Sequence, residues 1–453
     1  MKHSWFKTVF PIAAIFSFRM MGLFLLIPVF SIYAENLQGA TPTLVGFALG
    51  IYGLAQGLLQ MPFGMLSDKV GRKPVIAIGL VLFALGSLLG AITNSIYGMI
   101  IARALQGTGA IGSVLIALLA DLTPDEQRTK AMAVIGMTIG TSFSLAMVLS
   151  PALTHHFGLS GIFNLTTLLA IAGIILLYLV IPKPVNERFH VDSETNPALF
   201  KQVISNMQLQ RLNVGIFCQH FILTATFFAI PFILRKQVEQ GHLSQQWHFY
   251  LPIMIISFIL MIPFIILAEK KKRMKSVFLS SVFIMALTQS LLAYTFQNWM
   301  SLCTLILIYF IAFNILEAAL PSLVSKQANP NNKGTAMGIY STSQFLGLFL
   351  GGALAGILYQ WNSSQGIFIT NAIVGIIWLL ISLPMKSNVS FSTLILPSPW
   401  LQKNEQIISQ LLNAKGVIEV AFAEKEQVIY LRVDRERYLE GSAEKIIYHG
   451  NHK

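Results

Sequence analysis

Charge is scarce in this sequence. Only 11% of its 453 residues are Asp, Glu, Lys or Arg, against about 25% in soluble domains. Hydrophobic residues make up 55% of the chain, and the mean hydropathy is +0.67. This composition excludes an ordinary soluble globular protein, which needs far more polar surface. The sequence therefore predicts a protein that lies mostly in a lipid bilayer.

Cysteine is also nearly absent, with two residues in the whole chain. Cys218 and Cys303 both fall inside apolar runs, so we expect neither a disulfide framework nor a metal site, and no cofactor is indicated. A cleavable signal peptide is not expected either. The first apolar run carries Arg19 and leads to no A-x-A cleavage motif, so it is predicted to remain as a membrane span.

Long apolar runs fill most of the chain. A helix that crosses a bilayer needs about 20 apolar residues, and twelve such stretches can be read from the sequence. They lie at about 10–34, 42–66, 74–93, 96–121, 130–154, 160–181, 212–236, 248–268, 276–296, 298–324, 334–358 and 364–386. The sequence predicts an all-α polytopic membrane protein.

The distribution of Lys and Arg predicts the topology, because basic loops stay in the cytoplasm. The loops after spans 1, 3, 5, 9 and 11 contain neither residue, whereas the loops on the other side are basic, as at Lys69, Arg72 and Lys73. Both termini are therefore predicted to face the cytoplasm, across a bacterial inner membrane. The net charge of +12 largely reflects this asymmetry and does not indicate a nucleic-acid partner.

The chain divides into two similar halves of six spans each, residues 1–181 and 212–386, joined by a polar cytoplasmic linker at 182–211. The segment "PFGMLSDKVGR" (Pro62–Arg72) aligns without gaps with "PFIILAEKKKR" (Pro263–Arg273). Both segments follow the second span of their half. The halves are thus predicted to be parallel repeats, an arrangement that places a substrate site near the middle of the membrane at the repeat interface.

Residues 387–453 have a different composition and predict a small α/β domain. Their pattern is βαββα, with the central segment "KGVIEVAFAEKEQVIYLRVD", and resembles part of a ferredoxin-like module. The CxxC ligands of metal-binding modules of this kind are absent, so metal capture is not expected. A regulatory or stabilising cytoplasmic domain is one interpretation, and an inert folded tail is the other.

Two motifs resemble a known transporter family. The pattern Gly64-x-Leu66-x-Asp68-x-x-Gly71-Arg72-Lys73 resembles the signature loop of the major facilitator superfamily. Arg103, followed by "ALQGTGA", is similar to a second signature found in its drug:proton antiporter branch. The resemblance extends over nearly all of the chain and includes the appended ferredoxin-like tail. It implies the major facilitator fold and a secondary transporter.

The resemblance also implies a conformational latch on the cytoplasmic side. Asp68 would accept hydrogen bonds from the helix that starts near Asn331–Gly338, where the helix dipole favours a carboxylate, and would interact with Arg72 and Asp121. Such a latch would favour the outward-open state. The alternative is that these charges serve topology alone. The latch residues are predicted to be Gly64, Asp68, Gly71, Arg72, Asp121 and Arg128.

Charged residues inside the spans are candidates for coupling and substrate binding. Arg103 and Arg19 should face protein or water, because a charge in the bilayer costs about 2.5–3.5 kcal/mol on insertion scales. Glu317 is a carboxylate well inside an apolar run, where it could exchange protons or, alternatively, form a structural salt bridge with Arg19. The predicted cavity residues are Arg19, Arg103, Glu317, His220 and Glu35. His220 could equally be a core histidine, and Glu35 would lie at the outer mouth.

The sequence thus predicts a proton-coupled secondary transporter that exports drugs or other small molecules by alternating access, not an enzyme. Its expected partners are a small-molecule substrate, protons and the lipid bilayer, and the expected state is a monomer. Ser150-Pro151 stands where antiporters carry Gly-Pro, which leaves the direction of coupling open. A symporter or uniporter for a small metabolite is one alternative, and a transport-inactive membrane sensor is another.

Overall fold

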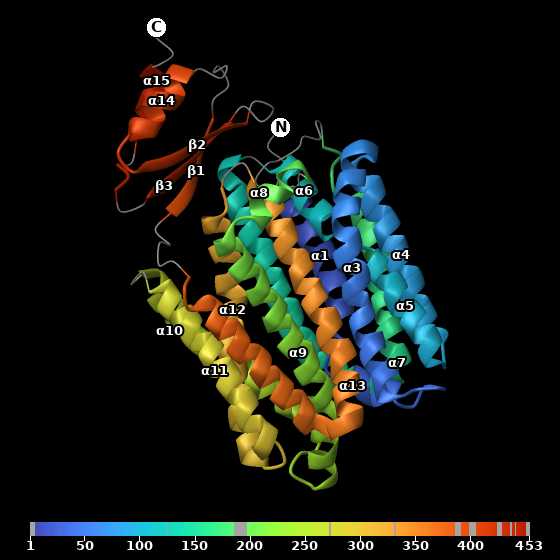
Figure 1. The fold of residues 1–453 in the computed structure, drawn as a ribbon. Helices are drawn as coiled ribbons and strands as arrows, with labels where there is room; N and C mark the ends of the chain where they lie inside the picture. Colours follow the sequence, from blue (N-terminus) through green and yellow to red (C-terminus); the bar gives the residue numbers. More distant parts are fainter. Residues whose placement is uncertain are drawn as a thin grey trace.

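The computed structural model describes residues 5–123, 125–184, 197–270, 273–329, 332–385, 391–397, 405–423, 428–434, 437–439 and 441–449. We call α1 to α7 the N-terminal half and α9 to α13 the C-terminal half (Figure 1). The N-terminal half contains α1 (Val9–Phe24), α2 (Phe30–Ala34), α3 (Pro42–Val70), α4 (Arg72–Ile92), α5 (Ile96–Thr108), α6 (Gly112–Leu122) and α7 (Asp125–Leu179). The connection contains the short helix α8 (Phe200–Ile204). The C-terminal half contains α9 (Met207–Glu239), α10 (Trp247–Lys270), α11 (Met274–Thr295), α12 (Trp299–Gln327) and α13 (Lys333–Ser382).

Twelve membrane crossings are present, as the sequence predicts. In the described part of the chain, 10 helices are long and apolar enough to cross a bilayer. Two of these, within α7 and α13, contain non-helical residues midway, at Gly158 and at Asn362 and Ser363. The chain turns back at these points, so each of the two long helices supplies a pair of crossings.

Two spans that the sequence predicts as continuous helices are broken. The first span is interrupted between α1 and α2, around Pro28, and the fourth between α5 and α6, around Gly109. A break frees backbone carbonyls that must be satisfied inside the membrane. Ser150 donates a hydrogen bond to the carbonyl of Leu25, and Arg19 Nε donates to the Gly109 carbonyl at 3.3 Å. Polar side chains from other spans therefore stabilise both breaks.

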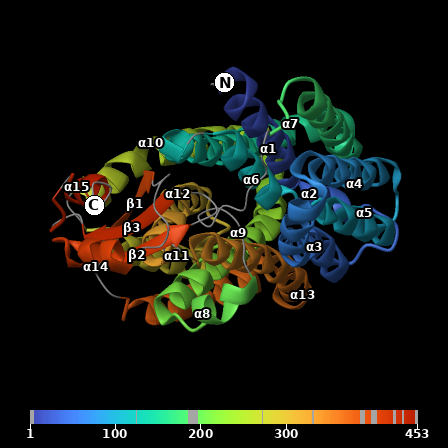
Figure 2. The ribbon, with the colours of Figure 1, turned by 90° about the horizontal axis from the view of Figure 1, so that it is seen from above.

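The two halves meet along α3 and α13, which lie side by side in two views of the molecule (Figures 1 and 2). Glycines allow this close contact. A Cβ atom added at Gly50 would lie 2.4 Å from the Phe349 carbonyl oxygen, and one at Gly46 would lie 2.4 Å from that of Gly352. Small residues on both helices thus let the two backbones come together.

The C-terminal tail folds into a three-stranded sheet with two helices. The elements are β1 (Phe391–Pro397), α14 (Glu405–Asn413), β2 (Val417–Ala423), β3 (Val428–Asp434) and α15 (Ser442–His449). The strand order is β1-β3-β2, with both pairs antiparallel. This is the split βαβ arrangement of ferredoxin-like folds, and it confirms the βαββα prediction. Buried Leu411, Ile429 and Leu431 form part of its core.

The sheet lies at one end of the helical bundle, on the side of the C-terminal half that contains α10 to α12 (Figures 1 and 2). The N-terminus and the α3–α4 junction lie at the same end (Figure 1). We call this the sheet end, and the other the opposite end. Helix α12 runs from Trp299 at the opposite end to Gln327 at the sheet end.

Candidate functional site

Glu317 lies in the middle of α12 and is held by residues of α9. Gln219 Nε2 donates a hydrogen bond of 2.9 Å to Glu317 Oε2. His220 Nε2 lies 3.8 Å from the same oxygen. The Glu317 side chain is 35% exposed, so a proton or a substrate group can reach it. The structure therefore brings together two of the predicted cavity residues, Glu317 and His220.

The hydrogen bonds of His220 indicate its tautomer. Its Nδ1 lies 3.3 Å from the carbonyl oxygen of Ile216, which can only accept a hydrogen. Its Nε2 lies 2.8 Å from Gln344 Nε2, an amide group that donates. A neutral imidazole with its proton on Nδ1 satisfies both partners. Nε2 is then a base that stands next to the Glu317 carboxyl group.

Aromatic rings from both halves meet one turn away from Glu317, on its opposite-end side. Phe143 of α7 stacks on Phe313 of α12, with ring centroids 5.9 Å apart. Phe143 also contacts Phe310 at 6.4 Å, and Phe24 of α1 meets it edge-on at 5.1 Å. We call Phe24, Phe143, Phe310 and Phe313 the aromatic gate. Its rings lie between Glu317 and the opposite end along α12.

Arg19 and Arg103 lie in the N-terminal half, and both are buried. Arg19 contacts the Gly109 carbonyl at the break between α5 and α6. Arg103 Nη1 donates to Gln106 Oε1 at 2.8 Å, and its guanidinium lies 4.8 Å above the ring of Tyr52. Among the described residues, no ion pair joins either arginine to a carboxylate. The salt bridge between Arg19 and Glu317, one of the two sequence interpretations, is therefore not formed in this structure.

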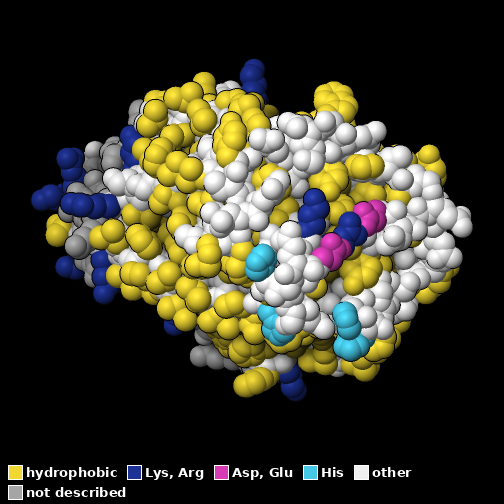
Figure 3. All heavy atoms as spheres, turned by 90° about the horizontal axis from the view of Figure 1, so that it is seen from below, with side chains coloured by type: hydrophobic (Ala, Val, Ile, Leu, Met, Phe, Trp, Pro, Cys, Tyr) yellow, Lys and Arg dark blue, Asp and Glu magenta, His cyan; other side chains and the backbone are white. Residues whose placement is uncertain are grey.

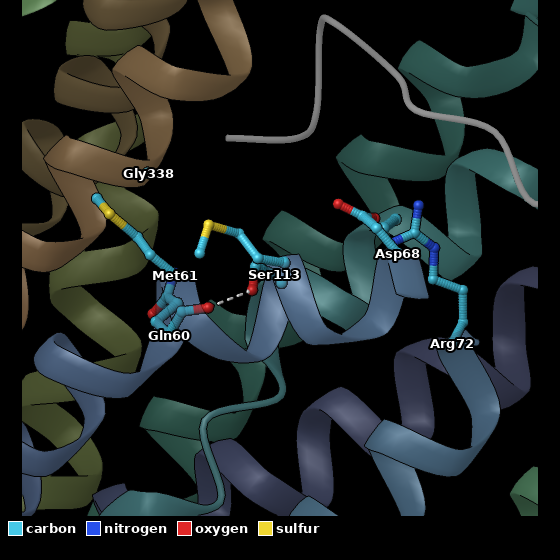
Figure 4. A pocket seen from close by; sticks show the side chains of 9 residues that line it. Gln60, Met61, Asp68, Arg72, Ser113 and Gly338 are labelled. Atoms are coloured by element: carbon cyan, nitrogen blue, oxygen red, sulfur yellow. Dashed lines mark hydrogen bonds and ion pairs between the residues drawn. The ribbon is translucent and has the colours of Figure 1, made fainter. Parts of the chain in front are cut away.

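Three of the predicted latch residues form a charged cluster at the sheet end. The buried Arg72 guanidinium donates from Nε to Asp121 Oδ2 at 3.2 Å, and it also pairs with Asp68. Arg72 Nη1 further donates to Ser67 Oγ at 2.7 Å. Figure 4 shows the Asp68 and Arg72 side chains turned towards one another across the α3–α4 junction. Arg72 thus ties the end of α3 to α6.

The two latch glycines have different environments. Gly71 has φ 102° between α3 and α4, a conformation that strongly favours glycine. At Gly64, a Cβ atom would meet only Ser113 Oγ, at 3.5 Å. This is an ordinary contact, so Gly64 is not crowded in this conformation.

The expected contact between Asp68 and the start of α13 is open here. In the described part of the chain, Asp68 pairs with Arg72 and forms no hydrogen bond with α13. Gly338 of α13 instead faces it across a small cavity (Figure 4). The side chain of Arg128, the remaining predicted latch residue, lies outside the described residues, as does Asn331.

At the opposite end the two halves are joined. Glu35, directly after α2, forms an ion pair with Arg235 of α9. Thr43 Oγ1 of α3 donates to Gln360 Oε1 of α13 at 2.7 Å. The predicted outer residue Glu35 therefore lies far from Glu317 along the bundle, at the contact between the halves.

A side chain of the tail that the sequence did not single out forms hydrogen bonds with the bundle. Arg432 of β3 donates from Nη1 to Asn329 Oδ1 at 3.0 Å. Its Nη2 donates to the carbonyls of Lys326 and Gln327, both at 3.4 Å. A cation is favoured there because these carbonyls end α12. Burial lowers the pKa of Arg432 and raises that of nearby Glu419, and their mutual attraction opposes both shifts.

Sequence reasoning also missed the neutral residues of the site. Gln219 and Gln344 hold the two titratable groups, and Phe143 and Phe313 form the stack beside them. Gln219 adjoins His220 in an otherwise apolar span, and a buried amide of this kind is a usable signal because it needs a partner. The two phenylalanines carry no such signal among the 32 in the chain.

Comparison with known proteins gives consistent matches. The sequence profile of the Major Facilitator Superfamily matches residues 12–351 and 212–413. The chain is 41% identical to the Inner membrane transport protein YajR of Escherichia coli (strain K12) over 430 residues, 94% of each chain. It is 26% identical to Multidrug resistance protein 2 of Bacillus subtilis (strain 168), over 79% of this chain and 90% of that protein.

Solved structures share the fold at low sequence identity. The nucleoside transporter NupG superposes with a TM-score of 0.65 at 18% identity, over 84% of this chain and 99% of its own. The xylose transporter XylE from E. coli, in a partially occluded inward-open conformation, superposes with a TM-score of 0.65 at 13% identity, over 83% of this chain and 97% of its own. These similarities concern the arrangement of the helices.

Proposed function

Because the chain belongs to the major facilitator superfamily, we propose that it is a proton-coupled secondary transporter that exports small molecules by alternating access. The superfamily consists of transporters rather than enzymes, and this chain is a multi-pass inner membrane protein. The observation that carries the proposal is Glu317, a mid-membrane carboxyl group that accepts a hydrogen bond from the neutral amide of Gln219. The similarity to a multidrug resistance protein favours export.

The neutral surroundings of Glu317 suit a proton carrier. A carboxylate next to a guanidinium stays charged, whereas one that faces neutral groups in a low-dielectric site can take up a proton at modest cost. Gln219 donates to the charged form. The Nε2 lone pair of His220, which accepts from Gln344 in this structure, can receive the proton that Glu317 loses when that hydrogen bond is exchanged. In the proposal, Glu317 carries the proton and His220 assists the transfer.

The arrangement of contacts corresponds to one state of the transport cycle. The halves are joined at the opposite end and at the aromatic gate, while Asp68 and α13 are apart at the sheet end. We assign the sheet end to the cytoplasm, as the basic loops predict, so this is an inward-facing state. Glu317 would release its proton to the cytoplasm here and admit the substrate. In the outward-facing state, Glu317 would take up a proton from outside, and this protonation would displace the substrate.

The latch complements this cycle. Asp68 would engage the N-terminus of α13 when the cytoplasmic end closes, and Arg72 with Asp121 holds Asp68 in place meanwhile. Closure would also bring α13 against Gly64, where the absence of a side chain would allow the two helices to approach closely. The latch therefore stabilises the outward-facing state and does not stabilise the inward-facing state.

A flux assay tests the proposal. An imposed pH gradient should drive purified protein in liposomes to transport one or more compounds from a panel of cationic and neutral drugs. Protons should move in the direction opposite to the compound. Proton movement in the same direction as the compound would replace antiport by symport. Flux without any proton movement would indicate a uniporter. A complete lack of flux, together with a signalling defect on removal of the tail, would favour the sensor interpretation.

A further inference from the structure

A second cavity lies at the opposite end of the molecule, remote from Glu317 and from the latch. It has a volume of about 130 Å³ and lies on the seam between the halves. Glu35 and Ser31 of the first span line one side, and Phe228, Phe232 and Tyr359 line the other. Figure 3 shows acidic and basic side chains side by side on this face, among mainly apolar and neutral atoms.

The two walls differ in chemistry. The wall from the C-terminal half is aromatic: Phe232 stacks on Tyr359 with ring centroids 4.8 Å apart, and Phe228 meets Tyr359 edge-on at 5.6 Å. The wall from the N-terminal half presents oxygen atoms. The Ser31 hydroxyl is fully buried and has no hydrogen-bond partner in the described part of the chain. A buried polar group without a partner is costly, so this hydroxyl marks a place for a ligand donor.

The aromatic wall already faces one cation. The Arg235 guanidinium lies 5.6 Å above the Phe232 ring and pairs with Oε1 of Glu35. Aromatic faces attract cations through the ring quadrupole. Because Arg235 contacts only one carboxylate oxygen, Oε2 of Glu35 can accept a bond from a second donor. The cavity thus offers acceptors on one side and a π surface on the other.

We propose that this cavity binds a protonated primary amine that carries an apolar body about the size of a benzene ring. The ammonium group donates to Glu35 Oε2 and to the Ser31 hydroxyl, and the apolar body lies against Phe228, Phe232 and Tyr359. The volume of about 130 Å³ is close to the 150 Å³ of a cavity that binds benzene, and the ammonium group would lie at the exposed Glu35 side chain. An anion is disfavoured because it would meet the free oxygen of Glu35 and the negative faces of the rings.

The position of the cavity has a conformational consequence, which rests on the proposed alternating-access function. The two walls come from different halves, so they face one another only while the opposite end is closed. A ligand that contacts both walls binds the closed arrangement better than the open one and shifts the population towards it. An amine bound here from outside would therefore hold the transporter in its inward-facing state and slow the cycle.

Benzylamine is a suitable probe, because it combines a benzene ring with an amine that is charged at pH 7. Full-length purified protein should gain thermal stability with increasing benzylamine, and benzyl alcohol and benzoate should have little effect at equal concentration. Glu35→Gln and Ser31→Ala should each weaken benzylamine binding by about 10- to 160-fold, as expected for the loss of a hydrogen bond to a charged group. Glu239→Gln, an exposed acidic residue at the end of α9, is the matched control and should bind as the unmodified protein does.

Three results would overturn the proposal: a benzylamine response that Glu35→Gln leaves intact, one that Glu317→Gln removes, or equal responses to benzylamine and benzyl alcohol. The measurement needs no transport. A failed flux assay would therefore leave the amine site standing, and a failed amine titration would leave the transport proposal standing.

Discussion

At the scale of single residues, the carboxyl groups of this protein differ in what they face. Asp68 and Asp121 contact the Arg72 guanidinium, whereas Glu317 contacts an amide and a neutral imidazole. The first pair thus lies beside a cation, whereas the third group lies beside neutral groups. The sequence reveals the charges inside spans, but their partners depend on how helices pack. For this reason Gln219 and Gln344 emerge only from the structure.

Asp68→Asn should shift the protein further towards the inward-facing state. The neutral amide loses the attraction of the α13 dipole, worth about 0.3–2 kcal/mol, which corresponds to a change of about 2- to 30-fold in the ratio of the two states. Distances between spin labels across the cytoplasmic mouth should lengthen. Lys69→Gln, an exposed neighbour, should leave them unchanged. Equal spin-label distances in the Asn variant and the unmodified protein would indicate that the loop containing Asp68 serves only to set the membrane topology.

Phe143→Ala should open a leak through the aromatic gate. The ring of Phe143 is the contribution of α7 to the stack on Phe313, and its removal leaves space for water between Glu317 and the outside. Liposomes with the variant should lose a pH gradient without added substrate, and Phe143→Leu should largely restore tightness. Phe283→Ala, at a residue 52% exposed on α11, is the control. A tight Phe143→Ala variant would show that the stack is not a gate.

At the scale of elements, hydropathy predicts the twelve crossings because each needs a long apolar run. It fails at the breaks after α1 and α5, since the residues there are as apolar as their neighbours. The breaks are stabilised by Ser150 and Arg19 from other spans, a tertiary effect that no local pattern contains. The βαββα order of the tail can be predicted because alternation and turn residues separate its elements.

Gly50→Ala should weaken the contact between α3 and α13. The added Cβ would lie 2.4 Å from the Phe349 carbonyl oxygen, and the backbone there must move. We expect a lower melting temperature and longer label distances at the opposite end. Gly136→Ala has nothing within 4 Å of its Cβ and should raise helix stability by about 0.5–1 kcal/mol. Equal behaviour of the two variants would contradict the close packing.

At the scale of the whole molecule, the tail forms its own sheet and core and contacts the bundle at the end of α12. Its core and sheet are self-contained, and the Arg432 contact joins it to the segment between α12 and α13. That segment leads directly to the start of α13, where the latch is expected to close. A domain held there is well placed to influence the latch. The sequence alone predicts a regulatory role as one interpretation of the tail, without indicating where the tail would act.

Removal of residues 387–453 should leave a folded membrane bundle with an altered transport rate. Arg432→Ala should keep the sheet folded but release it from α12, which hydrogen exchange at residues 326–329 would detect as faster exchange. Lys415→Ala, an exposed residue of the same domain, should have no such effect. Aggregation of the truncated protein would show that the tail belongs to the core fold.

The claim that Glu317 exchanges the coupled proton is tested most directly by Glu317→Gln, with melting temperature and substrate binding both measured against pH. The structure shows Glu317 next to neutral groups, so the account predicts a stability that holds or rises and a binding curve that no longer changes with pH. If Glu317 instead compensated a buried arginine, its loss would cost about 3–5 kcal/mol. A destabilised variant that still binds substrate with the original pH dependence would contradict the account.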